Sequence, residues 1–416
     1  MRRIFLIFGL CLLSAMAVQG TSRPDAPTAA EPNHIFVAIN GSDSNPGTLT
    51  APLASVAAAV SKVFPGDTIF VRGGVYPLDA MVAITTNGEP EGRIVLSKHR
   101  GDARPVFDFS AQPRRGDARG FELRADYWTI YGIDIRLAGD NGLYISGSNN
   151  LVEFSTFSEN NDSGLQLGQG ASNNLILNCD SFYNSDPREG NADGFAYKMD
   201  VGGGNLFSGC RSYNNSDDGW DGYLRGTSGD MDNAMVNCWA FCNGYRKNGD
   251  PGQGDGNGFK TGGYDPRHPL AHNVSLDRCI AAHNRVNGFD RNSNKGRIVI
   301  TNCSSEGNGR NNFSFPTGKD PEQFPGKQII IQNSISINGP EVFVAGPIVC
   351  GNNSWQTGKT YTESDFESLD YKQLYRPRKA DGSLPDITYL QPKAGGQLMD
   401  TAGRIDMSYY RNMPEN

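Results

Sequence analysis

The sequence is poor in histidine, in basic residues and in long hydrophobic runs, and each shortage narrows the possible functions. Its 416 residues include five histidines, whose spacing matches no zinc-binding motif: His34, His99, His268, His272 and His283. A zinc-dependent hydrolase is therefore not expected. Lysine and arginine together number 38 against 45 acidic residues, which gives a net charge of −7. Proteins that bind nucleic acid usually carry a basic stripe, so a nucleic-acid partner is not expected either.

The one long hydrophobic run lies at the start of the chain. Met1 and two arginines precede an apolar segment, 4–13, which is followed by the small residues of "SAMAVQG". This pattern predicts a secretory signal peptide, 1–20, that is cleaved after Ala17 or Gly20. No other segment is long and apolar enough to span a membrane. The mature protein is therefore expected to be secreted or periplasmic.

Long helical patterns are also scarce, whereas glycine is abundant and the central part of the chain repeats itself. Seven units align on a final asparagine, and successive asparagines are 24 to 41 residues apart. The aligned asparagines are Asn160, Asn184, Asn215, Asn243, Asn284, Asn308 and Asn338. Five positions earlier the units carry Ser155, Cys179, Cys210, Cys238, Cys279, Cys303 and Asn333. Units of this length, built of short strands and turns, predict an all-β fold, a right-handed parallel β-helix in which each unit forms one coil.

The two aligned columns predict how the coils hold together. Asparagine amides stacked in one column can hydrogen-bond along the axis of the helix. The cysteines in the other column need no disulfides, because a buried free cysteine behaves as a small hydrophobic residue. Seven of the eight cysteines follow the predicted cleavage site, an odd number that leaves at least one thiol free in any case.

The two ends of the chain differ from the repeats. Leu53, Val56, Val60 and Val63 lie on one face of an expected short helix, which would cap the N-terminal end of the solenoid. The sequence thus predicts a catalytic β-helix over 21–354, with its N-terminal cap at about 34–76, and a polar tail over 355–416 that packs on the coils.

A second alignment gathers charged residues on one face of the solenoid. It rests on a glycine followed by a bulky apolar residue, at Gly164-Leu165, Gly194-Phe195, Gly219-Trp220, Gly258-Phe259 and Gly288-Phe289. In this register Asp193 and Asp218 are neighbours on adjacent coils, as are Asp221 and Lys260, and Asp217 flanks the first pair. Clustered carboxylates suit a hard cation, and Ca²⁺ accepts a flexible cage of oxygen ligands. The alternative is a solvated acidic turn, since "SDDG" also favours turns.

Three segments, "NADGFA", "NNSDDGWDGY" and "GNGFKTGG", closely resemble in order and spacing the motifs of polysaccharide lyase family nine, the secreted pectate lyases and their relatives. The segments "GSDSNPGT" and "PRKADGSLPD" also resemble that family, so the similarity covers nearly the whole mature chain. The resemblance implies that Asp193, Asp217, Asp218 and Asp221 bind catalytic Ca²⁺ and that Lys260 is the Brønsted base. It leaves open whether homogalacturonan or the rhamnogalacturonan I backbone is the substrate.

The reaction implied by this resemblance is β-elimination. A base removes the C5 proton of a galacturonate, the C4–O bond breaks, and Ca²⁺ on the carboxylate stabilises the developing negative charge. A lysine acts as a base only when neutral, so an alkaline optimum is expected.

Arg225, Arg285 and Arg291 are candidates for binding other carboxylates of the pectic substrate, with surface solvation as the alternative for each. We expect the enzyme to be a monomer.

Two other functions remain open from the sequence. A β-helical glycoside hydrolase of pectin would use Asp193, Asp217 and Asp218 as acid and base without a metal, and Lys260 would only bind substrate. A non-catalytic carbohydrate-binding solenoid would use the aspartates to hold a structural Ca²⁺. Formation of an unsaturated product separates a lyase from both.

Overall fold

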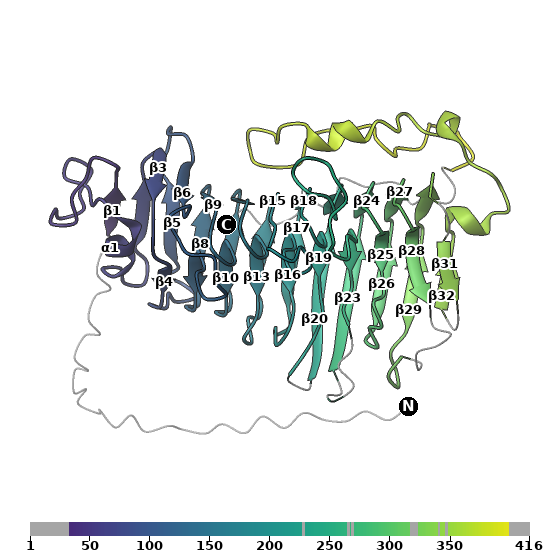
Figure 1. Cartoon of the computed structure of the whole chain (residues 1–416), viewed down its shortest axis with the longest axis horizontal. Coiled ribbons are helices and arrows are strands. Elements are labelled where there is room, and N and C mark those ends of the chain that lie inside the picture. The colour runs from purple at the N-terminus through teal and green to yellow at the C-terminus, as the bar shows by residue number, and fades with distance from the viewer. Residues whose placement is uncertain are drawn as a thin grey trace, which may run out of the picture. The chain divides into compact units, whose positions relative to one another are not determined.

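The computed structural model describes residues 33–226, 229–263, 267, 270–316, 323–339, 342–345 and 348–398. The described strands form three parallel sheets, and each coil of the chain passes from sheet A to sheet B to sheet C (Figure 1). The predicted signal peptide, 1–20, lies outside the described residues. Among the residues that are described, no helix is long and apolar enough to cross a membrane.

The strands are short, and most contain three or four residues. Sheet A consists of β1 (His34–Val37), β2 (Thr68–Val71), β5 (Ile94–Lys98), β8 (Trp128–Tyr131), β11 (Leu151–Glu153), β14 (Leu175–Leu177), β17 (Asn205–Ser208), β20 (Gly229–Val236), β23 (Leu270–Asp277), β26 (Ile298–Thr301), β29 (Ile329–Gln332) and β32 (Ile348–Gly351). Sheet B consists of β3 (Gly74–Pro77), β6 (Pro105–Asp108), β9 (Asp134–Arg136), β12 (Thr156–Ser158), β15 (Asp180–Phe182), β18 (Arg211–Tyr213), β21 (Trp239–Phe241), β24 (Ile280–Ala282), β27 (Ser304–Glu306) and β30 (Ile335–Ile337). Sheet C consists of β4 (Val82–Ile84), β7 (Phe121–Leu123), β10 (Leu143–Ile145), β13 (Leu165–Leu167), β16 (Phe195–Tyr197), β19 (Trp220–Asp221), β22 (Phe259–Lys260), β25 (Asn287–Asp290), β28 (Asn311–Pro316) and β31 (Val342–Ala345).

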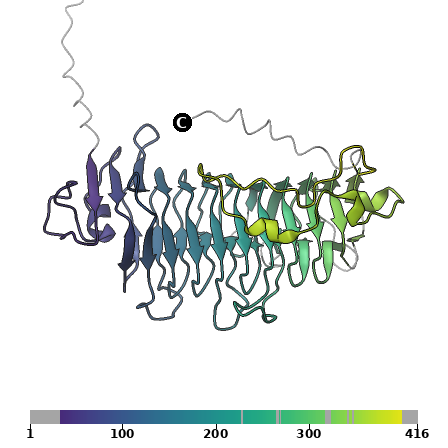
Figure 2. The ribbon, with the colours of Figure 1, turned by 90° about the horizontal axis from the view of Figure 1, so that it is seen from above.

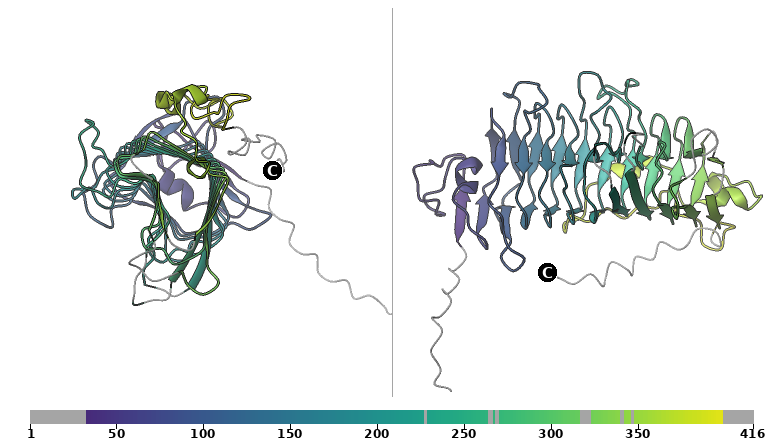
Figure 3. Two further views of the ribbon diagram at one scale, coloured as in Figure 1. Left: turned by 90° about the vertical axis from the view of Figure 1, so that its right-hand side faces the viewer. Right: turned by 90° about the horizontal axis from the view of Figure 1, so that it is seen from below.

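The left view of Figure 3 looks along the stack, with the three sheets around the interior. The buried side chains form one continuous hydrophobic core. Side chains alternate between the two faces of a strand, so each strand sends one set inward. In sheet C the inward rings of consecutive coils stack face to face, with centroids 5.0 Å apart for Phe195 and Trp220 and 4.8 Å apart for Trp220 and Phe259. This stacking fixes the register in which the outward residues of sheet C meet.

The predicted asparagine ladder is present between sheets B and C. Asn160 Nδ2 donates to Asn184 Oδ1 at 2.9 Å, and equivalent bonds of 2.8 or 2.9 Å continue along the column. The column then runs through Asn215, Asn243 and Asn284 to Asn308. These amides are buried, so the ladder pairs polar groups that would otherwise be costly to remove from water.

The alignment of the last unit is wrong by one residue. The pairing of β27 with β30 puts Ser334 in the cysteine column and Gly339 in the asparagine column, so Asn333 and Asn338 each lie one position early. Asn338 has a left-handed backbone conformation, with a φ of 50°. Gly307, at the equivalent position of the preceding coil, is also left-handed, with a φ of 63°. Asparagine can adopt this left-handed conformation and can also occupy the hydrogen-bonded ladder. The presence of an asparagine in the sequence therefore does not fix the register of the coil.

A second ladder, between sheets C and A, was not predicted. Asn174 Nδ2 donates to Asn205 Oδ1 at 3.0 Å, and Asn205 Nδ2 donates to Asn233 Oδ1 at 2.9 Å. The ladder ends on His272, whose Nε2 lies 2.8 Å from Asn233 Nδ2. Burial lowers the pKa of His272 to about 4, so its ring is neutral and accepts this bond.

The cysteine column is buried and unpaired, as predicted. Cys179, Cys210, Cys238, Cys279 and Cys303 are all free thiols with at most 1% exposure. The seven cysteines of the described residues form no disulfide. The column therefore contributes small apolar volume between sheets A and B rather than covalent links.

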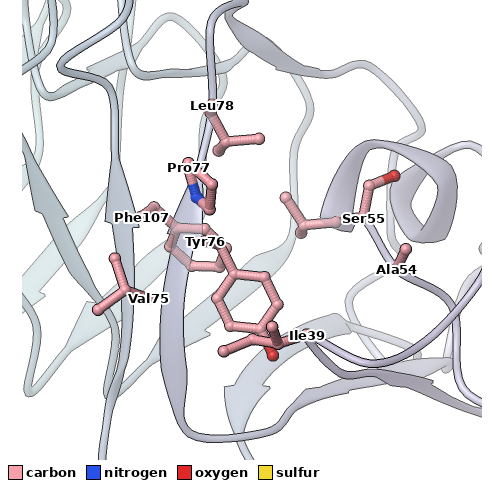
Figure 4. Close-up of a pocket in the computed structure, with 9 residues that line it drawn as sticks. Ile39, Ala54, Ser55, Val75, Tyr76, Pro77, Leu78 and Phe107 are labelled. Atoms are coloured by element: carbon pink, nitrogen blue, oxygen red, sulfur yellow. The ribbon is translucent and has the colours of Figure 1, made fainter.

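A short helix, α1 (Val56–Val60), contacts β1, β2 and β4 at the N-terminal end of the stack. It lies over the interior enclosed by the sheets (Figure 3, left) and buries Val56, Ala59 and Val60. Beside its start is a hollow of about 120 Å³ lined chiefly by apolar side chains, including Ile39, Tyr76 and Phe107 (Figure 4). This lining has no group of carboxylates or lysines, so the hollow belongs to the cap and not to a chemical centre.

The C-terminal segment crosses the outer face of sheet B, as predicted for the tail. Its described part contains three 3-10 helices, η1 (Ser354–Gln356), η2 (Glu363–Asp365) and η3 (Tyr371–Tyr375), and extends along the coils (Figures 1 and 2). Apolar residues of the tail form a second hydrophobic cluster with strands β21, β24 and β30. Arg378 also anchors it, because its Nη2 lies 2.7 Å from Asp180 Oδ1.

Candidate functional site

Five of the charged residues singled out from the sequence meet on the outer side of sheet C. Asp221 ends β19 and pairs with Lys260, which ends β22. Asp217 and Asp218 lie in the turn before β19, and Asp193 lies in the equivalent turn one coil earlier, before β16. The stacked inward rings described above hold these coils in register, so the aligned columns of the sequence are also vertical neighbours in space.

The carboxylates are held by hydrogen bonds from neighbouring coils and, for Asp221, from its own coil. Asp218 Oδ1 accepts from the Asn257 amide N at 2.7 Å and from its Nδ2 at 2.9 Å. Asp193 Oδ2 accepts from Ser163 Oγ at 3.0 Å, and Asp221 Oδ1 accepts from the Tyr223 amide at 3.0 Å. These contacts fix the carboxylate orientations before any ligand binds.

Two lysines face the carboxylates. Lys260 Nζ lies 3.1 Å from Asp218 Oδ2, 3.7 Å from Asp221 Oδ1 and 3.0 Å from Asp255 Oδ2. Lys198 Nζ lies 2.7 Å from Asp193 Oδ2 and 3.5 Å from Asp221 Oδ2.

The central residues are deeply buried. Lys260 is 8% exposed and Lys198 only 3%, while Asp193 and Asp218 have no exposed surface. Burial raises the pKa of Asp217 to about 8, with help from the charge of Asp218, and raises that of Asp218 to about 8 as well. Burial also holds the pKa of Asp193 well above its usual value, and the charges of Asp221 and Asp217 add to that effect.

Asp221 differs from its neighbours because both lysines contact it. Burial opposes its ionisation, but Lys260 and Lys198 outweigh burial and lower its pKa. In turn, the carboxylates outweigh burial at Lys260 and hold the pKa of its ammonium well above the usual value. With protein groups alone, Asp193, Asp217 and Asp218 therefore keep their protons to a higher pH than usual, because they are buried and lie close to other carboxylates.

The geometry offers oxygen ligands to a cation in two overlapping groups. Carboxylate oxygens of Asp193, Asp218 and Asp221 lie within 4.8 Å of one another, and so do those of Asp217, Asp218 and Asp255. Asp218 belongs to both groups, and its buried Oδ2 is ion-paired with Lys260 Nζ at 3.1 Å. Oxygen-only ligand sets of this kind suit hard cations such as Ca²⁺.

The three candidate arginines are placed differently from one another. Arg225 is exposed beside the ring of Tyr223, 5.7 Å from its centroid. Arg285 is half-buried and donates from Nη2 to the carbonyl of Gly254, in the loop that leads to Lys260. Arg291 is 1% exposed, and its Nη1 donates to the Pro316 carbonyl at 2.7 Å. The surroundings of Arg291 favour a structural role over contact with a substrate.

Lys198 and Asp255 were not found from the sequence. Lys198 lies five residues after Asp193, just beyond β16, and Asp255 lies five residues before Lys260 in a long loop. Both fall outside the columns that repeat from coil to coil. The available signal was their charge beside a motif residue, in "NADGFAYK" and "DGNGFK", rather than a repeated position.

Comparisons with known proteins agree with this architecture. Residues 35–323 match the family model described as "Pel9A-like, right handed beta helix region". The chain is 36% identical over 413 residues to "Pectate lyase L" of Paenibacillus polymyxa (strain SC2), covering 93% of this chain and 87% of that protein. It is 32% identical over 394 residues to "Pectate lyase L" of Dickeya chrysanthemi, covering 91% and 88%.

Two solved structures share the fold over most of the chain. The structure of pectate lyase Pel9A has a TM-score of 0.79 and 30% identity, covering 93% of this chain and 95% of that one. A structure called "Rhamnogalacturonan lyase" has a TM-score of 0.77 and 25% identity, covering 87% and 97%. These similarities confirm the right-handed parallel β-helix.

Proposed function

Because the chain belongs to the Pel9A-like, right-handed β-helix family and is a polysaccharide lyase, we propose that it cleaves galacturonate-containing pectin by Ca²⁺-dependent β-elimination. Lys260 is the proposed base, and Asp193, Asp217, Asp218 and Asp221 are the proposed Ca²⁺ ligands. The substrate is pectate or the backbone of rhamnogalacturonan I. The observation that carries the proposal is the pairing of Lys260 with Asp221 on adjacent outward positions of sheet C.

The charges of the cluster fit a dication. Five carboxylates, counting Asp255, face two ammonium groups, which leaves an excess of three negative charges when all of them are ionised. Burial, together with this excess, raises the pKa of Asp217 and of Asp218 to about 8, and the buried Oδ2 of Asp218, which is ion-paired with Lys260, is a candidate ligand atom. When bound, Ca²⁺ would draw electron density from the substrate carboxylate and so make the adjacent C5 proton more acidic.

Lys260 would supply the proton acceptor. Its Nζ is nearly buried and is held by three carboxylates, so its position is defined to within hydrogen-bond distance of Asp218 and Asp255. The same carboxylates raise the pKa of Lys260, so the neutral amine becomes more abundant as the pH rises. Turnover is therefore expected to increase through the alkaline range. Lys198 would keep Asp193 and Asp221 oriented while Lys260 exchanges its proton.

One assay tests this function and separates its alternatives. The enzyme is incubated with polygalacturonate and with rhamnogalacturonan I, each with and without chelator, and the ultraviolet absorbance of the unsaturated product is followed. We expect absorbance to increase on one of the two substrates and to stop on chelation. Cleavage that produces reducing ends without the double bond would instead indicate the hydrolase that uses Asp193, Asp217 and Asp218.

We further propose that the protein is exported by the signal peptide 1–20 and acts as a secreted or periplasmic monomer on pectic polysaccharide. The proposed catalytic unit is 21–354, with the cap at about 34–76, and 355–416 is the tail. Mass spectrometry of the secreted protein tests the export proposal. It identifies the first residue of the mature chain, which should follow Ala17 or Gly20.

A further inference from the structure

The outward residues of sheet C form a straight column that extends well beyond the carboxylates. Asp221 pairs with Lys260, Lys260 with Asp290, Asp290 with Ser314, and Ser314 with Phe343. Phe343 lies three coils from Lys260, which corresponds to about 14 Å at the usual spacing between strands. The column thus connects the proposed base to an aromatic residue near the C-terminal end of the stack.

Phe343 is an exposed aromatic residue in a strand of the solenoid. Its neighbours Val342 and Val344 pack against the hydrophobic interior, whereas Phe343 points outward and is 47% exposed. A phenyl ring on a regular strand has a fixed direction and loses little freedom when it binds a ligand. The exposed ring is therefore a rigid apolar platform in line with Lys260.

The side chains between Lys260 and Phe343 in this column are small and polar. Ser314 is small and buried, and Asp290 is half-buried with Oδ1 accepting from Asn287 Nδ2 at 2.9 Å. Ser314 and the backbone of Asn292 also stabilise the Asp290 carboxylate. No bulky side chain of this column stands between Lys260 and Phe343.

A positive charge lies at the same end of sheet C. A hollow of about 430 Å³ beside β31 is lined by Val342, Trp355 and Lys359, among others. The Lys359 side chain is exposed and adds positive charge at this end of the stack, although Phe343 does not line the hollow. Sugar rings carry an apolar face of C–H groups that packs on aromatic rings, and galacturonate units add the negative charge.

We propose that Phe343 is a stacking platform for a distal sugar unit of the same anionic polysaccharide whose reacting unit lies at Lys260. The inference deepens the proposed function and rests on it. A chain long enough to cover three coils gains the contact with Phe343, and a shorter chain does not. Affinity should therefore increase with the length of the oligosaccharide.

The test measures binding rather than cleavage. Galacturonate and rhamnogalacturonan oligomers of increasing length are titrated, with Ca²⁺, against the Lys260→Ala protein and against the same protein carrying Phe343→Ala. We expect Phe343→Ala to weaken binding of the long oligomers by about three- to tenfold and of the shortest ones by much less. Phe343→Trp should retain the dependence on length.

Val349→Ala is the matched control. Val349 belongs to β32 in sheet A, is 45% exposed and lies outside the column, so its removal should not change binding at any length. An equal loss for short and long oligomers, or no loss, would overturn the platform. A loss of self-association in Phe343→Ala, measured by sedimentation, together with unchanged oligomer binding, would show that a second copy of the chain covers the ring instead.

Failure of the platform can be separated from failure of the proposed function. Residual turnover by Lys260→Ala would contradict only the base, because binding could still be compared between Phe343→Ala and Val349→Ala. If the Lys260→Ala protein with Phe343 intact bound neither galacturonate nor rhamnogalacturonan oligomers, the substrate class would be wrong and the platform would be rejected with it. If that protein bound oligomers without dependence on length, the platform alone would be wrong.

Discussion

Asp221 Oδ1 and Lys260 Nζ lie 3.7 Å apart across the paired strands β19 and β22. The two residues come from consecutive coils and occupy the same outward position. Since the pairing of parallel strands is continuous along sheet C, neither residue can shift without disturbing the inward rings of Trp220 and Phe259. The fold therefore holds a carboxylate and a lysine that are distant in the sequence at a fixed separation.

The first prediction concerns the proposed base. Lys260→Ala should lower kcat by about 10²–10⁴-fold while substrate binding changes little, because a general base acts in the transition state. Lys260→Arg should not restore turnover, since a guanidinium keeps its proton at working pH. Initial rates of double-bond formation measure both variants.

Lys379 provides the control for Lys260. It forms an ion pair with Asp386 in the tail, at 2.6 Å, and is remote from the cluster in sequence and contacts. Lys379→Ala should retain full turnover. A Lys260→Arg enzyme with near-normal turnover would rule out the proton transfer assigned to this lysine.

The second prediction concerns removal of the cation. Exhaustive chelation should abolish turnover but leave the circular dichroism spectrum unchanged, because the hydrophobic interior and the asparagine ladder do not depend on the carboxylate cluster. Addition of Ca²⁺ should restore activity. Full turnover in the chelated enzyme would contradict the calcium requirement, and global unfolding on chelation would point to a structural cation.

The third prediction concerns Lys198, which pairs with Asp193 and Asp221 in a buried setting. Lys198→Met should lower the free energy of unfolding in chelator by about 3–5 kcal/mol, because it leaves buried carboxylates without a partner. Added Ca²⁺ should recover part of this loss by binding the native state. Urea unfolding with and without Ca²⁺ measures both effects.

Lys198→Arg is the conservative control, since it keeps the charge but not the compact shape of the ammonium. It should lose less stability than Lys198→Met in chelator. If Ca²⁺ stabilised the wild type and Lys198→Met by the same amount, and both only slightly, the cluster would not be the cation site.

Alignment of the repeats predicted the central site, because residues at the same position of consecutive repeats become neighbours when the coils stack. Asp193 and Asp218 occupy one column and Asp221 and Lys260 another, so their proximity followed from the parallel register. Lys198 escaped prediction because it lies just outside the repeated positions of β16. The length and path of each connecting loop vary from coil to coil, and periodicity carries no information about them.

The errors of the alignment have equally local causes. Asn338 is an asparagine like the residues of the ladder, but it occupies the neighbouring left-handed position. Asparagine also tolerates that conformation. Arg291 did not come from the alignment: it was a candidate for substrate binding, with surface solvation as the alternative, and it is buried and donates to the carbonyl of Pro316. Burial of a charged side chain depends on the loops that cover it, which the repeat does not encode.

The fourth prediction concerns the thiols. Alkylation of the native protein should label Cys242 and Cys350 first, because both are half-buried, whereas the five thiols of the column should react only after unfolding. Burial also raises the pKa of Cys242 and Cys350, so labelling should be slow even there. Mass spectrometry after stepwise denaturation gives the order. Detection of disulfides among the column cysteines would contradict the structure.

The last prediction concerns Asp180, which anchors the tail. Burial favours the neutral acid, but Arg378 and Arg211 outweigh burial and lower the pKa of Asp180 to about 2. The ordinary value in an unfolded chain is about 3.9, so the ionised form stabilises the folded state by roughly 2–3 kcal/mol above that pH. This contribution is lost as the pH falls from about 4 through about 2.

Asp180→Asn should therefore unfold more easily than the wild type at neutral pH, and the difference should shrink as the pH approaches 2. Asp386→Asn is the control, because Asp386 is 84% exposed in its pair with Lys379 and such pairs contribute little. Denaturant unfolding between pH 7 and pH 2 measures the difference, and limited proteolysis reports release of the tail. A difference between Asp180→Asn and the wild type that stayed constant down to pH 2 would show that the anchor acts through shape and hydrogen bonding rather than through the charge of Asp180.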